Sequence, residues 1–360
     1  MSIPTQGVAL ATLLLLCAAD SVAGDLDEAA EAVLAEYFAD DGPGAAVAVI
    51  ENGTLRADTA IGYADVEREI PIDQSTLFDL ASVSKHFTAS AALVLAGDGE
   101  IDVRQPVSAY VPDFAVESPG RPIRVIDLIH HISGISDYTA DDWRLSDAEF
   151  AQLTTETHLE WLNEQDSPEA PGTLYRYNNS GYVLLSLVVE RVSGQSYADF
   201  AKARLFQPAG MRNAQVMDSH RLRFRNQARG YKREEDGGFS PSTSPSSVTG
   251  DGNVYASLRD MVAWMRALDG ESVLDAAQKR VAWTNGRLDS GKALRDEDGN
   301  GYGYGWVIEA NGRVSHSGSW MGTATYVLRD SRSGVSVVVL SNDETADVSG
   351  IAGELLALVQ

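Results

Sequence analysis

The sequence predicts an α/β protein of the α+β type: one antiparallel sheet built from both chain ends, flanking helices and an all-helical insertion. Strand patterns bounded by turn residues occur near the start of the chain and again in its last third. Between about residues 97 and 268 the chain contains mainly helical patterns and long loops. Strands at both ends with helices between them favour a single sheet to which both termini contribute.

The first elements are a helix and a hairpin. Residues 25–39 are acidic and carry apolar residues at helical spacing, which predicts an amphipathic helix. Apolar segments at 45–50 and 55–63 flank Asn52-Gly53, a strong signal for a two-residue turn between antiparallel strands.

The middle of the chain is predicted to be helical. An amphipathic helical pattern begins at Ser82 and continues over 87–96, and a second helix covers 180–192 and ends at Gly194, a typical C-cap. Residues 236–252 are rich in Gly, Ser and Pro, which fits a domain linker or a loop at a surface or site rim. We favour the loop, because motifs continue on both sides of it.

The last third of the chain changes to strand patterns, with a closing helix expected at 351–359. Asn311-Gly312 and Ser333-Gly334 supply turns that suit antiparallel pairing. The predicted strands are 304–310, 313–318, 323–329 and 335–341.

Composition limits the partners of this protein. The 360 residues are 44% hydrophobic, enough for a sizeable core, and 52 acidic against 28 basic side chains give a net charge of −24. No Lys/Arg-rich block occurs, which argues against nucleic acid and anionic membranes as partners. We interpret the acidity as a well-solvated surface; repulsion of anionic ligands and adaptation to salt are the alternatives.

Residues 1–23 predict an export signal. The apolar run 8–19 has the length of a signal-peptide core and is too short to span a bilayer as a lone helix. Ser21-Val22-Ala23 places small residues before a cleavage point at Gly24, although no Lys or Arg precedes the run. Cleavage would make the protein extracytoplasmic, either periplasmic or secreted; an uncleaved anchor and a buried terminal helix are the alternatives.

Cys17 is the only cysteine and lies inside this apolar run. Lipidation there is disfavoured, because Leu16 occupies a position where a small residue is needed. Removal of the signal leaves a chain without cysteine, which excludes disulfides and thiolate metal sites in the mature protein.

Three short motifs carry the chemistry, in the order Ser82-Val83-Ser84-Lys85, Tyr177-Asn178-Asn179 and His316-Ser317-Gly318. A hydroxyl nucleophile needs a proton acceptor within hydrogen-bond reach. A Lys three residues along a helix stands one turn away on the same face, so Lys85 can serve Ser82. S-x-x-K alone arises readily by chance; the order of three motifs in suitable contexts favours a serine hydrolase site.

Ser82 and Lys85 also have ordinary structural interpretations. Ser82 would otherwise be a helix cap, and Lys85 a solvated surface charge. As a nucleophile, Ser82 would also use its own N–H as half of an oxyanion hole, because N–H groups at a helix start lack intrahelical partners. Burial among apolar neighbours would lower the pKa of Lys85 toward that of a working base.

Tyr177 is predicted on a loop before a helix, where its phenol could share a proton with a nearby ammonium as a second acid/base group. Tyr175 and Tyr182 are close in sequence, and any of the three could be a core aromatic. Asn179 favours Tyr177 by completing Y-x-N, and it offers an acceptor for the lysine and a donor for a substrate carbonyl.

His316 falls on a predicted strand two residues before Gly318, whose missing side chain would let substrate lie against the backbone. A lone His on a strand is usually structural, but the motif set favours a site role here. No metal is predicted for the pair His130-His131, because no carboxylate or Cys motif at ligand spacing accompanies it. No cofactor is predicted.

The chain resembles the serine β-lactamase and penicillin-binding-protein superfamily, in the branch of class C β-lactamases, DD-peptidases and family VIII-type esterases. The resemblance covers roughly residues 26–345. Beyond the three motifs it rests on 76–81, 127–135 (the family's LLxHTSGL), Pro171-Gly172, 205–211 (iFxPLGM), 250–257 (GdGGlysT) and 303–306 (YGlGw).

The resemblance implies a β-lactamase/DD-peptidase-like fold with the active site in the crevice between an α/β part and a helical part. It also implies that the second oxyanion donor is the N–H of Ser319, just after Gly318, and that His131 holds a structural position. A single catalytic domain is then expected at 24–360, with its α/β part over about 24–80 and 270–360 and its helical part over about 81–269.

We therefore predict an exported serine acyl-hydrolase that forms an acyl-enzyme on Ser82 and acts on neutral esters, amides or peptides. D-Ala-D-Ala carboxypeptidase and β-lactamase are the alternatives, because fold does not choose among these activities. A non-catalytic penicillin-binding sensor of the cell wall is the alternative of another class. The expected partner is a small-molecule or peptide acyl substrate, with no stable membrane insertion after signal removal.

The third motif bears on substrate class. Class C β-lactamases carry Lys-Thr-Gly where this chain has His316-Ser317-Gly318, and that Lys helps hold the β-lactam carboxylate. A neutral His is a weaker partner for an anion. Related peptidases with H-x-G use an Arg from the preceding strand, but here Glu309 lies on that strand and only Arg313 and Arg329 are near. Neutral short-chain esters or amides are expected to react faster than penicillins, cephalosporins or free-carboxylate peptides.

Overall fold

The computed structural model describes residues 25–360 with the exception of 141–149, 151, 220 and 245. The predicted signal at 1–23, with Cys17, therefore lies outside the described residues. Within the described ranges, no helix combines the length and the apolar character needed to cross a membrane.

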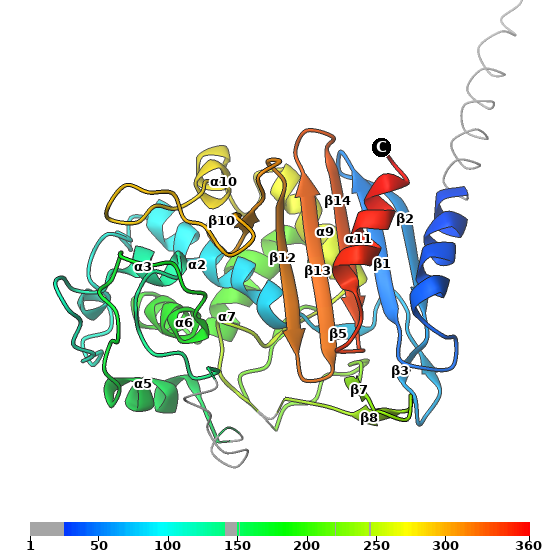
Figure 1. Ribbon diagram of the computed structural model, residues 1–360, viewed down its shortest axis with the longest axis horizontal. Helices are drawn as coiled ribbons and strands as arrows, with labels where there is room; N and C mark the ends of the chain where they lie inside the picture. The colour runs from blue at the N-terminus through cyan, green and yellow to red at the C-terminus, as the bar shows by residue number, and fades with distance from the viewer. Residues whose placement is uncertain (1–24, 141–149, 151, 220, 245) are drawn as a thin grey trace, which may run out of the picture.

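A seven-stranded antiparallel sheet forms the centre of the α/β part (Figure 1). Strand β1 pairs with β14 through Ala45 opposite Ser341, so segments from the two ends of the chain lie side by side. This confirms the predicted sheet built from both termini. In spatial order the strands are β10 (Gly301–Tyr302), β11 (Val307–Ile308), β12 (Val314–Trp320), β13 (Thr323–Asp330), β14 (Val335–Ser341), β1 (Ala45–Glu51) and β2 (Thr54–Ile61).

The predicted turn between β1 and β2 is confirmed. Asn52 and Gly53 have positive φ, at 48° and 75°. Gly adopts this backbone without steric cost and Asn does so more readily than most residues, which is why the dipeptide favours a tight hairpin. Gly312 and Gly334 also have positive φ, in the connections that lead into β12 and β14.

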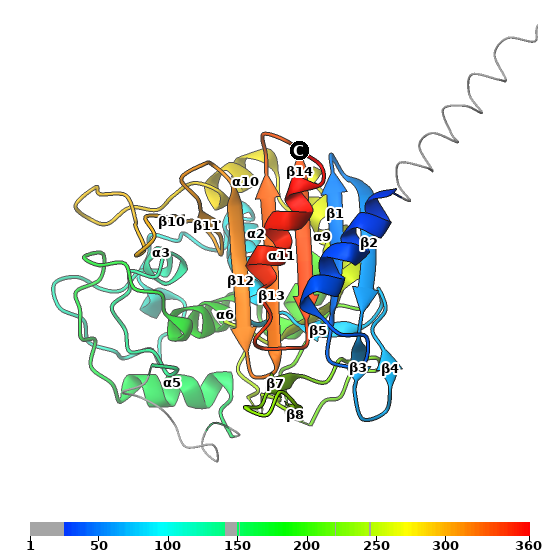
Figure 2. The ribbon, with the colours of Figure 1, turned by 45° about the vertical axis from the view of Figure 1, so that its right-hand side comes forward.

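Helices cover both faces of the sheet. The helix over 25–37 and α11 (Val348–Ala357) cross one face (Figure 2). On the other face, α9 (Leu258–Asp269) contacts β1 and β14. Successive residues of β1 enter the two cores alternately, as the pleat of a strand requires. Because both faces are covered, the strand is apolar from Ala45 to Ile50.

Helix α2 (Lys85–Gly97) is buried on every side, so the expectation of an amphipathic helix is wrong. All its residues from Lys85 to Leu95 are buried. The helix runs through the middle of the protein, between the sheet and the helical part, and not along the surface (Figure 1). Its polar side chains must therefore find partners inside the protein.

The helical part lies beside the β12 end of the sheet (Figure 1). Its longest helix, α6 (Asn179–Ser193), begins where the Asn178 side chain accepts from the Gly181 N–H and ends at Gly194, which has φ of 67°. This confirms the predicted C-cap. The other described helices of this part are α3 (Val125–Ile129), α5 (Thr155–Asn163), α7 (Tyr197–Ala201) and α8 (Gln207–Ala209). Short 3-10 turns occur at Val107–Ala109 and immediately before α2, and a π-helical turn covers Lys202–Phe206. Helix α10 (Ala276–Ala282) follows α9.

The structure also contains short strands that the sequence analysis did not predict. Strands of two to four residues are too short to show a period-2 pattern, and their partners lie far along the chain. The pairing of β5 with β9 places Asp79 opposite Tyr255, next to the nucleophile turn. The small sheets are β3 (Tyr63–Asp65) with β4 (Ile70–Pro71), β5 (Leu77–Asp79) with β9 (Val254–Ser257) and β6 (Gln215–Val216), and β7 (Tyr231–Arg233) with β8 (Phe239–Pro241).

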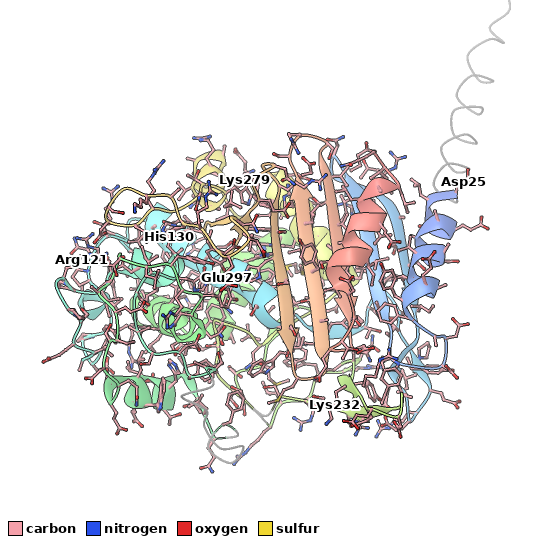
Figure 3. All side chains as sticks on the ribbon, in the orientation of Figure 1. Asp25, Arg121, His130, Lys232, Lys279 and Glu297 are labelled. Atoms are coloured by element: carbon pink, nitrogen blue, oxygen red, sulfur yellow. The ribbon has the colours of Figure 1, made fainter. Side chains whose placement is uncertain are left out.

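Arg121 connects the helical part to the segment that returns to the sheet. Its guanidinium contacts Asp127 and Asp289, each at 2.6 Å. Asp127 is 1% exposed, and it also accepts a hydrogen bond from the backbone N–H of Arg124 at 2.7 Å. Figure 3 shows Arg121 at the outer side of the helical part. The bidentate contact with a buried carboxylate fixes the loop that leads into α3.

Candidate active site

Ser82 lies in a 3-10 turn, η1 (Ala81–Ser84), that links β5 to α2. Ala81, immediately before it, has φ of 45°. Such a left-handed backbone costs a non-Gly residue about 1–3 kcal/mol and persists only where its surroundings hold it. Here the Asp79 carboxylate accepts a hydrogen bond from the Ala81 N–H at 2.9 Å. The turn places Ser82 at the wall of a cavity instead of in the core.

Lys85 lies beside the Ser82 hydroxyl, as predicted from the S-x-x-K spacing. Its Nζ is 3.1 Å from Oγ of Ser82, 2.8 Å from Oδ1 of Asn179 and 2.9 Å from the carbonyl oxygen of Asp251. Lys85 is 0% exposed. This burial lowers its pKa to about 8, although the charges of Asp251 and Asp137 oppose the shift. Near pH 8 a large fraction of the amine is therefore neutral and can accept a proton.

The structure adds two acidic residues to which the sequence analysis gave no role. Asp251 accepts a hydrogen bond from the Tyr138 hydroxyl at 2.7 Å, and Asp137 accepts one from the Asn179 N–H at 2.8 Å. Burial raises the pKa of Asp251 to about 6, so it is ionised at neutral pH. The one sequence signal for Asp251 was its place in segment 250–257.

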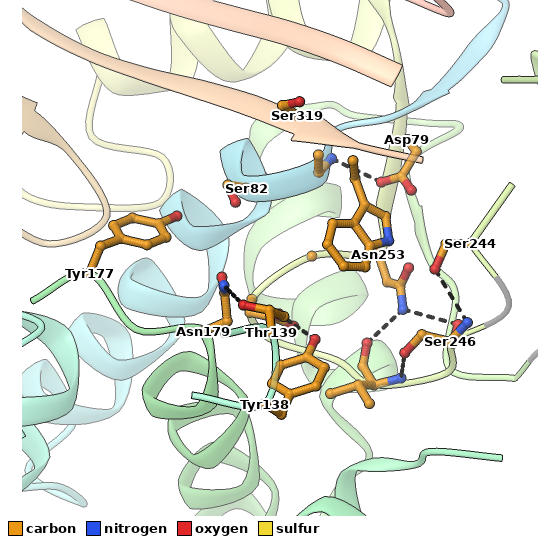
Figure 4. Close-up of a pocket in the computed structure, with 15 residues that line it drawn as sticks. Asp79, Ser82, Tyr138, Thr139, Tyr177, Asn179, Ser244, Ser246, Asn253 and Ser319 are labelled. Atoms are coloured by element: carbon orange, nitrogen blue, oxygen red, sulfur yellow. Dashed lines mark hydrogen bonds between the residues drawn. The ribbon is translucent and has the colours of Figure 1, made fainter. Parts of the chain in front are cut away.

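Of the three tyrosines considered in the sequence, Tyr175, Tyr177 and Tyr182, it is Tyr177 whose hydroxyl points toward the nucleophile, Ser82, as Figure 4 shows. Nζ of Lys85 lies 4.9 Å from the centre of the Tyr177 ring. The residue is 37% exposed, but desolvation of its hydroxyl end raises the pKa of the phenol, and the neighbouring Ser82 only partly offsets this. Tyr182 instead donates to the carbonyl of Ile129 at 3.0 Å.

Both the oxygen and the nitrogen of the Asn179 side-chain amide form hydrogen bonds. Its Oδ1 accepts from Lys85, as expected, and its Nδ2 donates to Oγ1 of Thr139 at 2.7 Å. An amide NH₂ has two hydrogens, so one remains for a substrate carbonyl. Asn178 caps helix α6 and donates to the carbonyl of Ile135 at 2.8 Å, which matches the local turn role expected of it.

His316 lies on β12 with both ring nitrogens engaged by the protein. Its Nε2 is 2.9 Å from the Tyr302 hydroxyl, and its Nδ1 is 2.6 Å from the carbonyl oxygen of Ser317. Because a carbonyl only accepts, Nδ1 carries the hydrogen and Nε2 accepts from Tyr302. Burial lowers the pKa of His316 to about 3, with a further contribution from Lys85. The imidazole is therefore neutral and offers a substrate no free N–H.

Gly318 lets strand β12 approach the nucleophile turn. A Cβ there would overlap the carbonyl oxygen of Leu80 and lie 3.1 Å from the Cβ of Ala81. Trp320 and Thr323 flank a two-residue turn and form a hydrogen-bonded pair of the β12–β13 ladder. Hydrogen-bonded and non-hydrogen-bonded pairs alternate in an antiparallel ladder, so the next pair, Ser319 and Ala324, is not hydrogen-bonded. The Ser319 N–H therefore points away from β13, to the side of β12 where β11 pairs only with Val314 and Ser315 and leaves Ser319 unpaired.

His131 supports the Y-x-N loop. Its Nδ1 accepts from the Asn178 N–H at 3.1 Å, and its carbonyl accepts from the Arg176 N–H at 2.9 Å. These contacts agree with the structural position that the resemblance implied. Over the described part of the chain, no group of three or more His, Cys, Asp or Glu side chains is placed to hold a metal ion.

Two spaces meet at Ser82. A cavity of about 210 Å³ extends from it on one side (Figure 4). A wider, more open cleft of about 900 Å³ lies on the other side, and Figure 3 places one of its lining residues, Glu297, between the helical part and the sheet. The site thus has a narrower arm and a wider, more open arm. Within 236–252, predicted as a surface or site-rim loop, the cavity is lined by Ser244, Ser246, Val248, Asp251 and Gly252.

The cations near the open cleft differ from those considered in the sequence. Arg313 is bound by Asp330 at 3.1 Å and Arg329 by Asp269 at 2.5 Å, so both are already paired. Arg176 and Arg295 line the cleft instead. Arg176 pairs with Glu169 at 2.6 Å, whereas Arg295 donates to a backbone carbonyl.

Comparison with known proteins places this geometry in a family. A model of the Beta-lactamase family matches residues 28–360. Penicillin-binding protein 4* of Bacillus subtilis (strain 168) is 30% identical over 83% of this chain and 68% of its own length. A D-aminopeptidase of Gluconobacter oxydans (strain 621H) is 30% identical over 91% of this chain and 60% of its own length. The chain thus spans only part of the relatives it matches.

Solved structures agree with the fold. The octameric penicillin-binding protein homologue from Pyrococcus abyssi superposes with a TM-score of 0.79 at 27% identity, covering 93% of this chain and 76% of the other. EstCE1, a hydrolase with promiscuous acyltransferase activity, gives 0.76 at 20% identity over 95% of this chain and all of its own, which shows the fold alone. With its serine–lysine pair set between a sheet of both termini and a helical part, the chain belongs to the β-lactamase family of serine hydrolases.

Proposed function

We propose that this protein is an exported serine acyl-hydrolase that forms an acyl-enzyme on Ser82, with neutral esters and amides as its substrates. The observation that carries the proposal is the 3.1 Å contact between Oγ of Ser82 and the buried Nζ of Lys85. A lysine with a pKa of about 8 is a competent base near neutral pH, whereas an ordinary lysine is not.

Acylation follows from this contact. The neutral amine of Lys85 accepts the hydroxyl proton while Oγ of Ser82 forms a bond to the substrate carbonyl carbon, and the carbonyl electron pair moves to oxygen. The bond to the leaving group then breaks, and the leaving alcohol or amine takes a proton through the Tyr177 hydroxyl. The raised pKa of Tyr177 suits a group that passes a proton on rather than one that rests as phenolate.

The oxyanion formed in this step faces the N–H groups of Ser82 and Ser319. Losing one such donor typically costs about 10²–10³ in kcat. Gly318 and the left-handed Ala81 support this arrangement by bringing β12 and the nucleophile turn close together. Water then attacks the acyl-enzyme, its proton passes to Lys85 or Tyr177, and the carbon–Oγ bond breaks as Ser82 regains its proton.

The proposal for carboxylate-free substrates rests on the charges around Ser82. His316 is neutral and has no free donor, and Lys85 is committed to Ser82 and its two other acceptors. The narrower cavity is lined by Asp79 and Asp251 and by no Lys or Arg among the described residues. The name of the D-aminopeptidase relative supports amide substrates. D-Ala-D-Ala carboxypeptidase and β-lactamase remain the alternative activities, with Arg295 as the candidate partner for a carboxylate.

One experiment separates turnover from the sensor alternative. Purified protein lacking residues 1–23 is mixed with p-nitrophenyl butyrate in excess, and p-nitrophenol is counted per enzyme molecule. We expect release to continue far beyond one equivalent and to be absent in Ser82→Ala. A burst that stops at one equivalent would identify a protein that acylates without deacylating, as a binding sensor does.

A further inference from the structure

We propose that Arg121 sets the separation of the two walls of the open cleft beside Ser82, through its clamp on Asp289. Arg121 is thereby a positioning residue, which acts through the residues that it holds and not by touching substrate. The inference rests on the proposed hydrolase function and deepens it, because the separation of the walls determines how well the leaving group of a substrate binds. The alternative is that the clamp only stabilises the fold.

The two walls of the open cleft come from distant parts of the chain. One wall is the loop that carries Tyr177, of which residues 174–177 line the cleft. The other wall is the segment between α10 and β10, of which residues 295–297 line the cleft. Because the walls are far apart in the sequence, their separation depends on contacts between them and not on local structure.

Arg121 has all five of its side-chain N–H groups engaged. Nη1 and Nη2 bind the two oxygens of the buried Asp127 at 2.6 and 2.9 Å. Nε and Nη2 bind the two oxygens of Asp289 at 2.6 and 3.1 Å, and Nη1 also donates to the carbonyl of Pro122 at 3.1 Å. Two bidentate carboxylates on one planar guanidinium fix its orientation, so the clamp holds Asp289 in place relative to the helical part.

Asp289 also binds the start of the first wall. Its backbone N–H donates to the carbonyl of Gly172 at 2.9 Å, and Gly172 lies just before residues 174–177. A Cβ on Gly172 would lie 2.5 Å from both Nη2 of Arg121 and Cγ of Asp289, so this packing requires a residue without a side chain. The φ of Gly172 is 79°, which also favours glycine. The clamp thus ties the first wall to the second.

The second wall carries the position of the clamp to the cleft. Residues 286–294 form a hairpin that closes with a hydrogen bond from the Leu294 N–H to the Gly286 carbonyl at 3.0 Å. Asp289 lies within this hairpin, and the cleft-lining residues follow it directly in the sequence. Figure 3 shows Arg121 at the outer side of the helical part and Glu297 nearer the sheet. The wall is therefore clamped at its outer side and meets the cleft at its inner side.

The open cleft suits the leaving group. Tyr177, which passes a proton to the leaving alcohol in the proposed mechanism, lines this cleft. The alcohol must depart before water attacks, and the wider space of about 900 Å³ gives it a path to solvent while the acyl group stays on Ser82 beside the narrower cavity. A leaving group large enough to touch both walls therefore depends on their separation, whereas a small one does not.

The test compares two esters that share an acyl group. Ethyl butyrate leaves most of the cleft empty, whereas benzyl butyrate carries an aromatic ring into it. Release of butyric acid is followed by titration at constant pH 8. We expect Asp289→Ala to raise KM for benzyl butyrate at least about fivefold, with KM for ethyl butyrate within about twofold and kcat for both esters within about threefold of wild type. A rise in KM at unchanged kcat reports lost binding and not lost chemistry.

Arg121→Lys is the second variant. It keeps a cation for the buried Asp127, but a single ammonium cannot bind two carboxylates bidentately, so the link to Asp289 is lost. We expect the same selective rise in KM for benzyl butyrate. Thermal unfolding of both variants shows whether they are folded.

Asp113→Ala is the matched control. The Asp113 side chain is 55% exposed and pairs with Arg191, which also binds Glu156. Asp289 is 50% exposed and likewise shares an arginine with a second carboxylate. Asp113 is not among the residues that line the cleft, so this variant should keep the wild-type KM for both esters.

The outcomes separate this inference from the proposed function. If the wild-type protein releases no butyric acid from either ester, the hydrolase function itself fails. If it hydrolyses both esters but folded Asp289→Ala and Arg121→Lys keep the wild-type KM for benzyl butyrate, or lose kcat equally on both esters, the clamp only stabilises the fold and the inference is overturned.

Discussion

Lys85 donates to the backbone carbonyl of Asp251 at 2.9 Å and forms no ion pair with its carboxylate, which is held instead by Tyr138 at 2.7 Å. The ammonium therefore has three acceptors but, among the described residues, no direct counter-ion. Burial consequently dominates, and the pKa of Lys85 falls to about 8. The Asp251 carboxylate raises that pKa from a distance, so it partly offsets the effect of burial.

This relationship predicts the pH dependence of the enzyme. Lys85 must be neutral to act, so kcat/KM on p-nitrophenyl butyrate should rise with pH and level off above an apparent pKa of about 8. Asp251→Asn removes a charge that favours the ammonium form, so the rise should move to lower pH. In Lys85→Ala, kcat/KM should fall at least ~100-fold and should no longer rise with pH. A rise that moves to higher pH in Asp251→Asn would contradict the assignment of the titrating group to Lys85.

Tyr177 provides a second test, against a close neighbour in sequence. Tyr177→Phe removes the hydroxyl directed toward Ser82 and should slow both acylation and deacylation, by about 10²–10⁴-fold for a lost proton-transfer group. Tyr175→Phe, in which the same atom is lost two residues away, should retain most activity. Pre-steady-state release of p-nitrophenol measures the two steps separately. Full activity in Tyr177→Phe with loss in Tyr175→Phe would show that the wrong tyrosine was assigned.

Gly318 tests the oxyanion hole without touching its donors. Gly318→Val would push β12 away from Leu80 and Ala81 and displace the Ser319 N–H, so we expect at least ~100-fold loss of kcat. Gly353→Ala, where a Cβ meets nothing within 4 Å, is the matched control and should leave activity unchanged and stability equal or slightly higher. Thermal unfolding distinguishes loss of fold from loss of catalysis; a fully active Gly318→Val would rule out the close approach.

The charges around the site also predict substrate class. Because His316 is neutral and both its nitrogens are occupied, the third motif offers a carboxylate no charged partner. We expect kcat/KM for p-nitrophenyl butyrate to exceed that for nitrocefin. A nitrocefin value well above the ester value would move the assignment to a β-lactamase.

The sequence predicted the sheet well because its strands carry local signals. Asn52-Gly53 and the long apolar runs at β1 and β14 are visible in a few adjacent residues. Helix α2 was misjudged as amphipathic, because whether its polar residues face water or partners depends on segments far along the chain. Thr88, for example, donates to the carbonyl of Gly250, 162 residues away.

The candidate site divides in the same way. Ser82, Lys85, Tyr177 and Asn179 occur in recognisable motifs, and the structure brings them together. Asp79 and Asp251 lie in the segments 76–81 and 250–257 on which the resemblance rests, but their contributions depend on burial and on contacts between distant parts of the chain, which those segments do not reveal. Likewise, the sequence around His316 did not show that the Tyr302 hydroxyl would form a hydrogen bond with its Nε2.

The central claim is that Ser82 is the nucleophile, and covalent labelling tests it most directly. The protein is treated with a fluorophosphonate probe, digested, and the modified peptide identified by mass spectrometry. We predict a single adduct on the peptide that holds Ser82, and none in a folded Ser82→Ala variant. An adduct on Ser133 or Ser319 with Ser82 unmodified would contradict the account.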